Sequence, residues 1–262
     1  MNILVLYHSG VGSTKFVAEL LSKELSSYNH NVALTSIEKP HNIDQYDLLC
    51  IGFPTYHASP SYSITNYIDK LPRFRAKKPA FIFTTCGLYS ANTLRIFTKQ
   101  CLEKNIIPIY YSSYRSPASD GVLVLPNLKL LQRFQKGLEK KIKYDVDNIF
   151  KASLTNKLNK PKFKFYSILN IPNKLGGKSF APNIHLIKSE CIKCKKCVID
   201  CPHNCFSYDE GGYPIYSKSK CEHCYRCIHH CPKKALNIFK NKPPKVQLHG
   251  ISSSNGRVTM DI

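Results

Sequence analysis

Residues 191–202 read Cys191-Ile192-Lys193-Cys194-Lys195-Lys196-Cys197-Val198-Ile199-Asp200-Cys201-Pro202, and residues 221–232 read Cys221-Glu222-His223-Cys224-Tyr225-Arg226-Cys227-Ile228-His229-His230-Cys231-Pro232. Both runs have the spacing C-x2-C-x2-C-x3-C-P, and the second repeats the first at an offset of 30 residues, from Cys191 to Cys221. The repeat continues past the prolines and pairs Cys205 with Ala235. Eight cysteines thus form two equivalent sets of four, and a ninth stands opposite a small residue.

This spacing is typical of paired cubane [4Fe-4S] clusters. Three thiolates at two-residue intervals wrap one cluster, while the fourth, stiffened by the following proline, is aimed at the other cluster. The segment closely resembles the two-cluster ferredoxins. The resemblance implies that one cluster is held by Cys191, Cys194, Cys197 and Cys231, and the second by Cys221, Cys224, Cys227 and Cys201.

Two other interpretations of the cysteines fit less well. Zinc sites usually have two C-x2-C pairs with a longer spacer, and they do not need a third cysteine two residues on and a fourth before proline. A disulfide framework is typical of small secreted domains, and nothing in this chain indicates secretion. We interpret Cys205 as a packing residue rather than a ligand, because its counterpart in the repeat is Ala235.

Short strands are expected around the cysteines. Residues 206–216 alternate apolar and polar side chains about Gly211-Gly212, which predicts a hairpin. The apolar stretches 184–187 and 236–239 occupy matching places before and after the runs, and we expect them to form edge strands of a pseudo-twofold unit.

Composition and charge narrow the class of protein. The chain has 262 residues and a formal net charge of +21, and residues 151–190 contain eight basic side chains with Glu190 as the only acid. A basic surface steers acidic partners, so we expect redox partner proteins with acidic surfaces and no nucleic-acid partner. With no apolar run long enough for a membrane span and no signal peptide at the N-terminus, a cytoplasmic protein is expected. Oxygen-sensitive clusters suggest an anaerobic or microaerobic cell.

The N-terminus has a strand, a glycine-bearing loop and a helix in succession. Residues 3–7 are continuously apolar, residues 8–15 contain Gly10 and Gly12, and apolar residues then recur at helical spacing from Phe16 to Leu25. In such an arrangement the loop N–H groups and the helix N-terminus bind a phosphate, and serine or threonine hydroxyls complete the site.

The same alternation continues to about residue 111. Strands are predicted over 31–37, 47–51, 80–85 and 106–111, with helices over 61–71 and 91–103. This order predicts a doubly wound five-stranded parallel sheet, in which ligands bind at the carboxyl ends of the strands. A last helix is expected with Leu128, Leu131, Phe134, Leu138 and Ile142 on its buried face.

Three strand-end loops resemble those of flavodoxins. The phosphate loop departs from the usual flavodoxin pattern in two places, because Val11 replaces a threonine and Ser13 replaces an asparagine; we expect weaker FMN binding rather than none. Tyr56 and Tyr89 would stack on opposite faces of the flavin, Cys86 would be a small residue beside it, and His57 is interpreted as an exposed loop residue. The resemblance implies FMN binding by Ser9, Gly10, Val11, Gly12, Ser13, Thr14, Pro54, Thr55, Tyr56, His57, Thr85, Cys86, Gly87 and Tyr89.

The remaining parts are assigned by composition. Cys50 and Cys101 are expected in the core. We divide the chain into a flavodoxin-like domain (1–150), a basic and partly apolar connecting segment that wraps across the domain boundary (151–183), a ferredoxin domain (184–240) and a polar tail, loose or lying on the surface (241–262).

Nearly the whole chain resembles the flavodoxin–ferredoxin fusion proteins. The expected fold is therefore a flavodoxin-like α/β domain followed by a small α+β domain with two [4Fe-4S] clusters. The resemblance implies an electron-transfer protein that passes electrons between FMN and the clusters, with or without oxidoreductase activity on a substrate. The alternative is a ferredoxin-type carrier whose flavodoxin-like domain binds no flavin and docks a partner.

Overall fold

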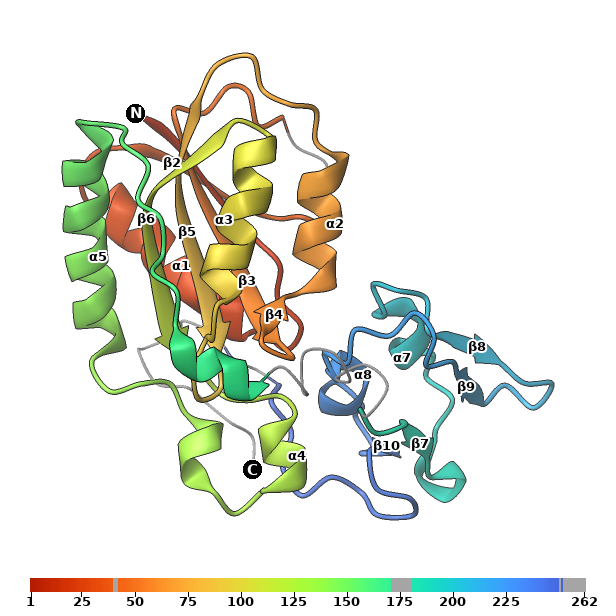
Figure 1. The fold of residues 1–262 in the computed structure, drawn as a ribbon. Coiled ribbons are helices and arrows are strands. Elements are labelled where there is room, and N and C mark those ends of the chain that lie inside the picture. Colours follow the sequence, from red (N-terminus) through yellow and green to blue (C-terminus); the bar gives the residue numbers. More distant parts are fainter. Residues whose placement is uncertain (40–41, 171–180, 250, 252–262) are drawn as a thin grey trace.

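The computed structural model describes residues 1–39, 42–170, 181–249 and 251. A large α/β domain is built on a central sheet, and a small domain lies against the end of that sheet (Figure 1). None of the helices in the described ranges is long and apolar enough to cross a membrane.

The sheet of the large domain has five parallel strands in the order β2-β1-β3-β5-β6. The direction in which successive strands are added to the sheet reverses between β1 and β3. This is the switch point of a flavodoxin-like doubly wound fold, and it confirms the predicted class. A two-residue strand, β4, pairs antiparallel with the end of β3 and was not predicted. The strands are β1 (Asn2–Tyr7), β2 (Asn31–Ser36), β3 (Leu48–Tyr56), β4 (Ser59–Pro60), β5 (Lys78–Cys86) and β6 (Ile106–Arg115).

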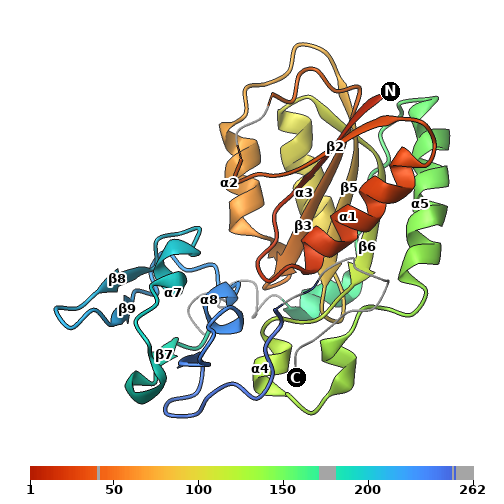
Figure 2. The same cartoon turned by 180° about the vertical axis from the view of Figure 1, so that it is seen from behind.

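Two pairs of helices cover the sheet. Helices α1 (Ser13–Ser26) and α5 (Leu138–Ser153) pack together on one face, whereas α2 (Tyr62–Lys70) and α3 (Thr93–Glu103) cover the other (Figures 1 and 2). Strand β1 contributes fully buried side chains to both faces, which is why residues 3–6 are continuously apolar. Cys50 and Cys101 are fully buried in these two cores, as expected.

The predicted helix with Leu128 and Leu131 on its face is wrong in its first half. Residues 121–137 form a short helix α4 (Gly121–Val124), a 3-10 turn (Lys129–Gln132) and a loop. Helix α5 begins only after Gly137, whose φ of 68° is incompatible with a continuing right-handed helix. Leu131 is nevertheless buried in the core, while Leu128 is 46% exposed.

The connecting segment begins after Ser153, and its described part lies on the large domain. The N–H of Asn159 donates to the carbonyl of Pro108 on β6 at 2.8 Å, and Arg95 donates to the carbonyl of Pro161 at 3.1 Å. A 3-10 helix follows at Phe165–Asn170. Residues 171–180, through which the segment was expected to cross between the domains, lie outside the described residues.

The small domain has the predicted pseudo-twofold arrangement. Strands β8 (Phe206–Tyr208) and β9 (Pro214–Tyr216) form the hairpin, and β7 (His185–Leu186) pairs antiparallel with β10 (Leu236–Asn237). A 3-10 turn spans Lys188–Glu190. Each cysteine run contains one short helix, α7 (Lys196–Ile199) in the first and α8 (Arg226–His229) in the second.

The expectation that the whole tail is loose or lies on the surface is wrong for Gln247, Leu248 and Ile251. Leu248 is fully buried and Ile251 nearly so, and both belong to the same apolar core as α1 and α5. The Gln247 amide donates to the carbonyls of Ile228 and Cys231 at 2.7 and 2.9 Å. This part of the tail therefore joins the small domain to the large one, and residues 252–262 lie outside the described ranges.

Candidate redox-cofactor sites

A cavity lies at the carboxyl ends of β1, β3, β5 and β6. Twelve of the fourteen residues predicted for the flavin site line it, and Gly12 and Tyr89 do not. The predicted residues that line the cavity are Ser9, Gly10, Val11, Ser13, Thr14, Pro54, Thr55, Tyr56, His57, Thr85, Cys86 and Gly87. The loop from Ser116 to Asp120 and two small-domain residues, His223 and Tyr225, complete the wall.

The phosphate loop has the features that an anion site needs. Gly12 takes a left-handed φ of 103° before α1, and its N–H donates to the Ser9 hydroxyl at 3.1 Å. The Ser13 hydroxyl lines the cavity, is buried and has no hydrogen-bond partner among the described atoms. A phosphate at the helix N-terminus would satisfy it, so the loop fits the phosphate group of FMN.

Val11 lies where flavodoxins often have threonine, and its side chain is buried. It belongs to the core cluster that also contains Leu248 and Ile251. The loop is also tied to β5, because the hydroxyls of Thr14 and Thr85 lie 2.7 Å apart. The missing threonine hydroxyl is thus replaced by apolar packing beneath the loop, while the backbone of the loop still lines the cavity.

Gly12 and Tyr89 have other surroundings. Gly12 packs near Ile251, where it shapes the turn into α1. Tyr89 is exposed and contacts Tyr166 of the connecting segment edge-to-face, with ring centroids 5.8 Å apart. Lys164 beside it donates to the Ser90 hydroxyl at 3.0 Å, so the connecting segment holds this loop.

Residues 116–120 were missed as part of the cavity. They follow β6, which continues to Arg115 rather than ending near Tyr111. Ligands bind beyond the carboxyl ends of the strands. Residues 116–120 would therefore have been predicted if the strand had been extended through its polar residues to Arg115. Asp120 accepts a hydrogen bond from the N–H of Gly121 at 2.8 Å and begins α4.

The first cysteine set surrounds one cavity in the small domain. Cys191, Cys194, Cys197 and Cys231 all line it, together with apolar Leu186, Pro214 and Leu236. The N–H of Ala235 donates to the Cys231 sulfur at 3.2 Å. Four thiols around one apolar-walled space, with a backbone N–H on a sulfur, fit a [4Fe-4S] cluster.

The cysteines of the second set also lie near one another. Burial and the neighbouring sulfurs of Cys224, Cys221 and Cys201 raise the pKa of Cys227. The N–H of Cys205 donates to Cys201 at 3.3 Å, which repeats the bond from Ala235 to Cys231. All twelve cysteines lie within the described ranges and are free of disulfides.

Cys205 is buried as expected, but it does more than fill space. Hydrogen bonds from its side chain lower the pKa of Cys201 to about 5 and that of Cys221 to about 6. Its thiol therefore lies against two of the sulfurs expected to hold the second cluster. Its counterpart Ala235 has no such group, so the two cluster sites differ in this donor.

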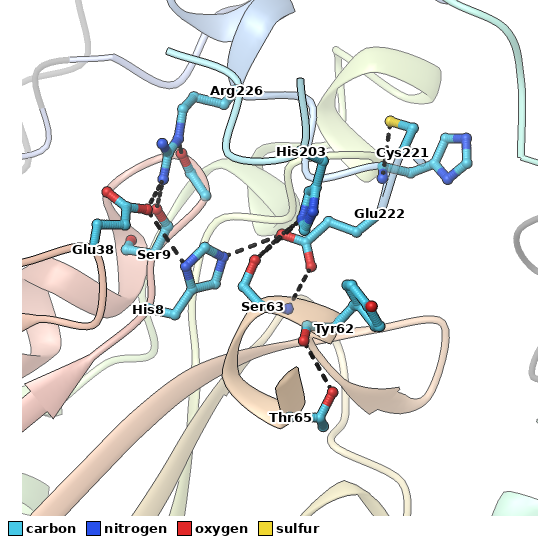
Figure 3. Close-up of polar contacts among 12 residues, drawn as sticks. His8, Ser9, Glu38, Tyr62, Ser63, Thr65, His203, Cys221, Glu222 and Arg226 are labelled. Carbon is cyan, nitrogen blue, oxygen red and sulfur yellow. Dashed lines mark hydrogen bonds and ion pairs between the residues drawn. The ribbon is translucent and has the colours of Figure 1, made fainter. Parts of the chain in front are cut away.

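Arg226 attaches the second cluster site to the phosphate loop (Figure 3). Its guanidinium donates to the carbonyl oxygens of Gly10 at 2.8 Å and Ser9 at 2.7 Å. It also donates to the carboxylate of Glu38 at 3.0 Å and to the carbonyl of Asp200 at 3.0 Å. Because these carbonyls are held by Arg226, one side of the phosphate loop is fixed by the small domain.

Glu222 forms a second polar link between the domains. Its carboxylate accepts hydrogen bonds from the Ser63 N–H at 3.1 Å and the Ser63 hydroxyl at 3.0 Å, and it pairs with His8 at 3.2 Å and His203 at 3.3 Å (Figure 3). Burial alone would raise the pKa of Glu222, but the hydrogen bonds and charges of His203 and His8 outweigh it and hold the pKa below its usual value. The Glu222 hydrogen bond raises the pKa of His203.

His229 joins three segments. Its Nε2–H donates to the carbonyl of Ser119 at 2.8 Å, and its Nδ1 accepts from the N–H of Leu248 at 3.1 Å. Burial lowers the pKa of this imidazole to about 4, so it is neutral near pH 7. The sequence analysis missed Glu222, Arg226 and His229. These residues lie between the cysteines of the second run and have no identical counterparts in the first run, and this difference was a usable signal.

The fold and the two kinds of site define a class of redox protein with a flavodoxin-like domain and a cluster-binding domain. A family model described as a flavodoxin domain matches residues 4–108, and one described as a 4Fe-4S dicluster domain matches residues 190–235. In this order along one chain, the two matches agree with the domain order of the flavodoxin–ferredoxin fusion proteins.

A curated relative and several solved structures are also similar to parts of the chain. An uncharacterized protein of Methanocaldococcus jannaschii is 33% identical over 88 residues, which cover 33% of this chain and 55% of the relative. An archaeal flavodoxin is 16% identical (57% of this chain, 99% of that chain, TM-score 0.40). Rubredoxin oxygen:oxidoreductase from the anaerobe Desulfovibrio gigas is 13% identical (59% of this chain, 36% of that chain, TM-score 0.46).

Proposed function

We propose that this chain binds FMN in the large domain and two [4Fe-4S] clusters in the small domain, and that electrons pass between them inside one molecule. The flavodoxin and dicluster domains support an electron-transfer role. FMN supplies two-electron and one-electron chemistry when bound, and each cluster exchanges one electron at a time. The clusters require reduced thiols, so we place the protein in the cytoplasm.

The observation that carries this proposal is the contact between the phosphate loop and the second cluster site. A Cβ atom built on Gly10 would collide with the Tyr56 hydroxyl and lie 3.0 Å from the Cβ of Cys224. His223 and Tyr225, on either side of Cys224, line the same cavity as the phosphate loop. The expected cluster ligand Cys224 therefore lies against the loop that lines the candidate flavin site.

The chain's own residues hold this arrangement together. Arg226 fixes the carbonyls of the phosphate loop, while Ser13, which lines the cavity, keeps a buried hydroxyl with no hydrogen-bond partner among the described residues. Tyr225 is only 4% exposed and, together with His223, covers the cavity from the small domain. These side chains exclude water from the region between the two cofactors, which favours direct electron exchange over reaction with solvent species.

The cofactor content can be tested directly. Anaerobically reconstituted protein should contain about eight iron atoms and one FMN per chain, with cluster absorbance reduced to about half when Cys194 is changed to serine. Ser13→Ala should weaken FMN binding, and Ser22→Ala, half-buried further along α1, serves as the matched control. Eight iron atoms without FMN, after FMN has been offered in excess, would favour the flavin-free docking domain instead.

A further inference from the structure

The small domain has two faces that the internal repeat makes equivalent, and the large domain covers only one of them. The face around the second cysteine run contains Glu222, His223, Tyr225 and Arg226, and the first three are buried against the rest of the chain. At an offset of 30 residues, the corresponding positions in the first run are Ile192, Lys193, Lys195 and Lys196, and all four are exposed. Helix α8 lies towards the large domain, whereas α7 lies on the side away from it (Figures 1 and 2).

The uncovered face surrounds the first cluster site. Cys194 is exposed, whereas its counterpart Cys224 is 8% exposed. Lys193, Lys195, Lys196 and Lys233 line the cavity around the first cysteine set. Ile192 lies among them and is 56% exposed, so an apolar residue stands within a ring of cations. An apolar centre with a charged rim is the usual composition of a transient protein-docking surface.

Two of these lysines lie against tyrosine rings, a contact that positions the ammonium group without neutralising it. The Nζ of Lys193 lies 4.3 Å from the ring centroid of Tyr213, and that of Lys195 lies 5.4 Å from the ring of Tyr208. In the part of the chain that the structure describes, neither Lys193, Lys195, Lys196 nor Lys233 forms an ion pair. These cations are therefore free to attract carboxylates of another molecule.

We propose that this lysine face, formed by Ile192, Lys193, Lys195, Lys196 and Lys233, is the docking site for an electron-transfer protein with an acidic surface. The inference rests on the proposed function, because it requires a cluster at the first cysteine set. A second copy of this chain would bring a formal side-chain charge of +21 to this positively charged face, and that repulsion opposes the contact. In this proposal the partner covers the face around the first cysteine run, just as the large domain covers the face around the second run.

Electron exchange at this face needs no bond to form or break. One electron leaves the reduced cluster and reduces the metal centre of the partner, so the cluster is oxidised by one electron. The order of centres along the molecule is then the flavin cavity, the second cysteine set, the first cysteine set and the external partner.

Two forms of one acceptor test the proposal. Horse cytochrome c is basic, and its succinylated form is acidic, yet both have the same haem. Fully dithionite-reduced protein should reduce the succinylated form faster at low ionic strength, and added salt should slow it. Changing Lys193, Lys195, Lys196 and Lys233 to Glu should lower that rate about tenfold or more and raise the rate with native cytochrome c. Iron content and cluster absorbance should be unchanged.

A matched control has the same change in net charge at a distance. Lys140, Lys143, Lys151 and Lys157 are exposed on α5 and just after it, and α5 lies on the side of the large domain away from the cluster sites (Figure 1). Their change to Glu should leave the rate with the succinylated form within about twofold. An equal loss in both variants, or no loss in the lysine-face variant, would overturn the proposal. If the Glu variant loses iron, the four Lys→Gln changes answer the same question. Because dithionite reduces every centre, the result does not depend on FMN-to-cluster transfer.

Discussion

The Cβ of Cys224 lies 3.0 Å from the position where a side chain on Gly10 would begin. One residue is an expected cluster ligand and the other belongs to the phosphate loop, and they are more than two hundred positions apart in the sequence. Two domains joined only by a flexible linker would not keep so close a contact. Arg226, Glu222 and His229 of the small domain all form hydrogen bonds with residues of the large domain, and these bonds hold the two domains together.

Gly10 should not tolerate a side chain. Gly10→Ala would bring a Cβ against the Tyr56 hydroxyl and the Cβ of Cys224, and we expect it to lower stability by about 1–3 kcal/mol and to weaken FMN binding. Denaturant unfolding and flavin titration measure the two effects. Gly10→Ala combined with Tyr56→Phe should recover part of the stability, because the nearest obstructing atom is removed. Gly211→Ala, on the exposed hairpin, should have little effect on FMN binding.

Arg226 should matter for both stability and electron transfer. Arg226→Met removes four hydrogen bonds that hold the phosphate loop, Glu38 and Asp200. A carbonyl left unpaired at the interface lowers the stability of the folded protein. We expect a loss of about 2 kcal/mol in the free energy of unfolding and slower flavin-to-cluster transfer. Arg73→Met, at an exposed position of the large domain, is the control. Equal behaviour of the two variants would show that the guanidinium does not hold the domains together.

The Glu222–His203 pair should make the interface sensitive to pH. The pKa of His203 is raised above its ordinary 6.5, so its contribution to stability is complete below about pH 6.5 and is lost as the pH rises through the folded value. The pKa of Glu222 is lowered, so its contribution is present above about pH 4.5 and lost only on acidification. The melting temperature of the reconstituted protein should therefore fall as the pH rises above about 6.5. His203→Gln should flatten that fall, and an unchanged slope would exclude His203 as its origin.

Cys205 should tune only the second cluster. A thiol that lowers the pKa of Cys201 and Cys221 favours negative charge on their sulfurs, so Cys205→Ala should lower one of the two reduction potentials and leave the other unchanged. Cys205→Ser keeps a donor and should shift the potential less. Redox titration followed by electron paramagnetic resonance separates the two clusters. Loss of four iron atoms in Cys205→Ala would instead make Cys205 a ligand.

The parts of the fold that depend on local patterns were predictable. Continuous apolar runs identified the buried strands, and the C-x2-C-x2-C-x3-C-P spacing identified the thiols that line the first cluster cavity. The false helix near Leu128 arose because Leu131 and Phe134 have helical spacing but pack from a loop that ends at Gly137.

What could not be predicted depends on how the two domains meet. Glu222 and Arg226 look like surface residues between cysteines, and their partners Ser63, His8 and Ser9 lie in the other domain. Leu248 lies between Gln247 and His249 in the sequence, and no long periodic pattern runs through this stretch to indicate that it enters the core of the large domain. Tertiary contacts decide such positions, and periodicity alone does not report them.

The most direct test of the account is the rate of electron transfer within one molecule. Anaerobic flash photoreduction of the FMN-loaded protein should reduce the flavin first and then the clusters, with a first-order rate that does not change with protein concentration. Because the phosphate loop contacts Cys224, Gly10→Ala and Arg226→Met should slow this step. A rate proportional to protein concentration, or clusters that stay oxidised while the flavin is reduced and the redox potentials permit transfer, would contradict the account.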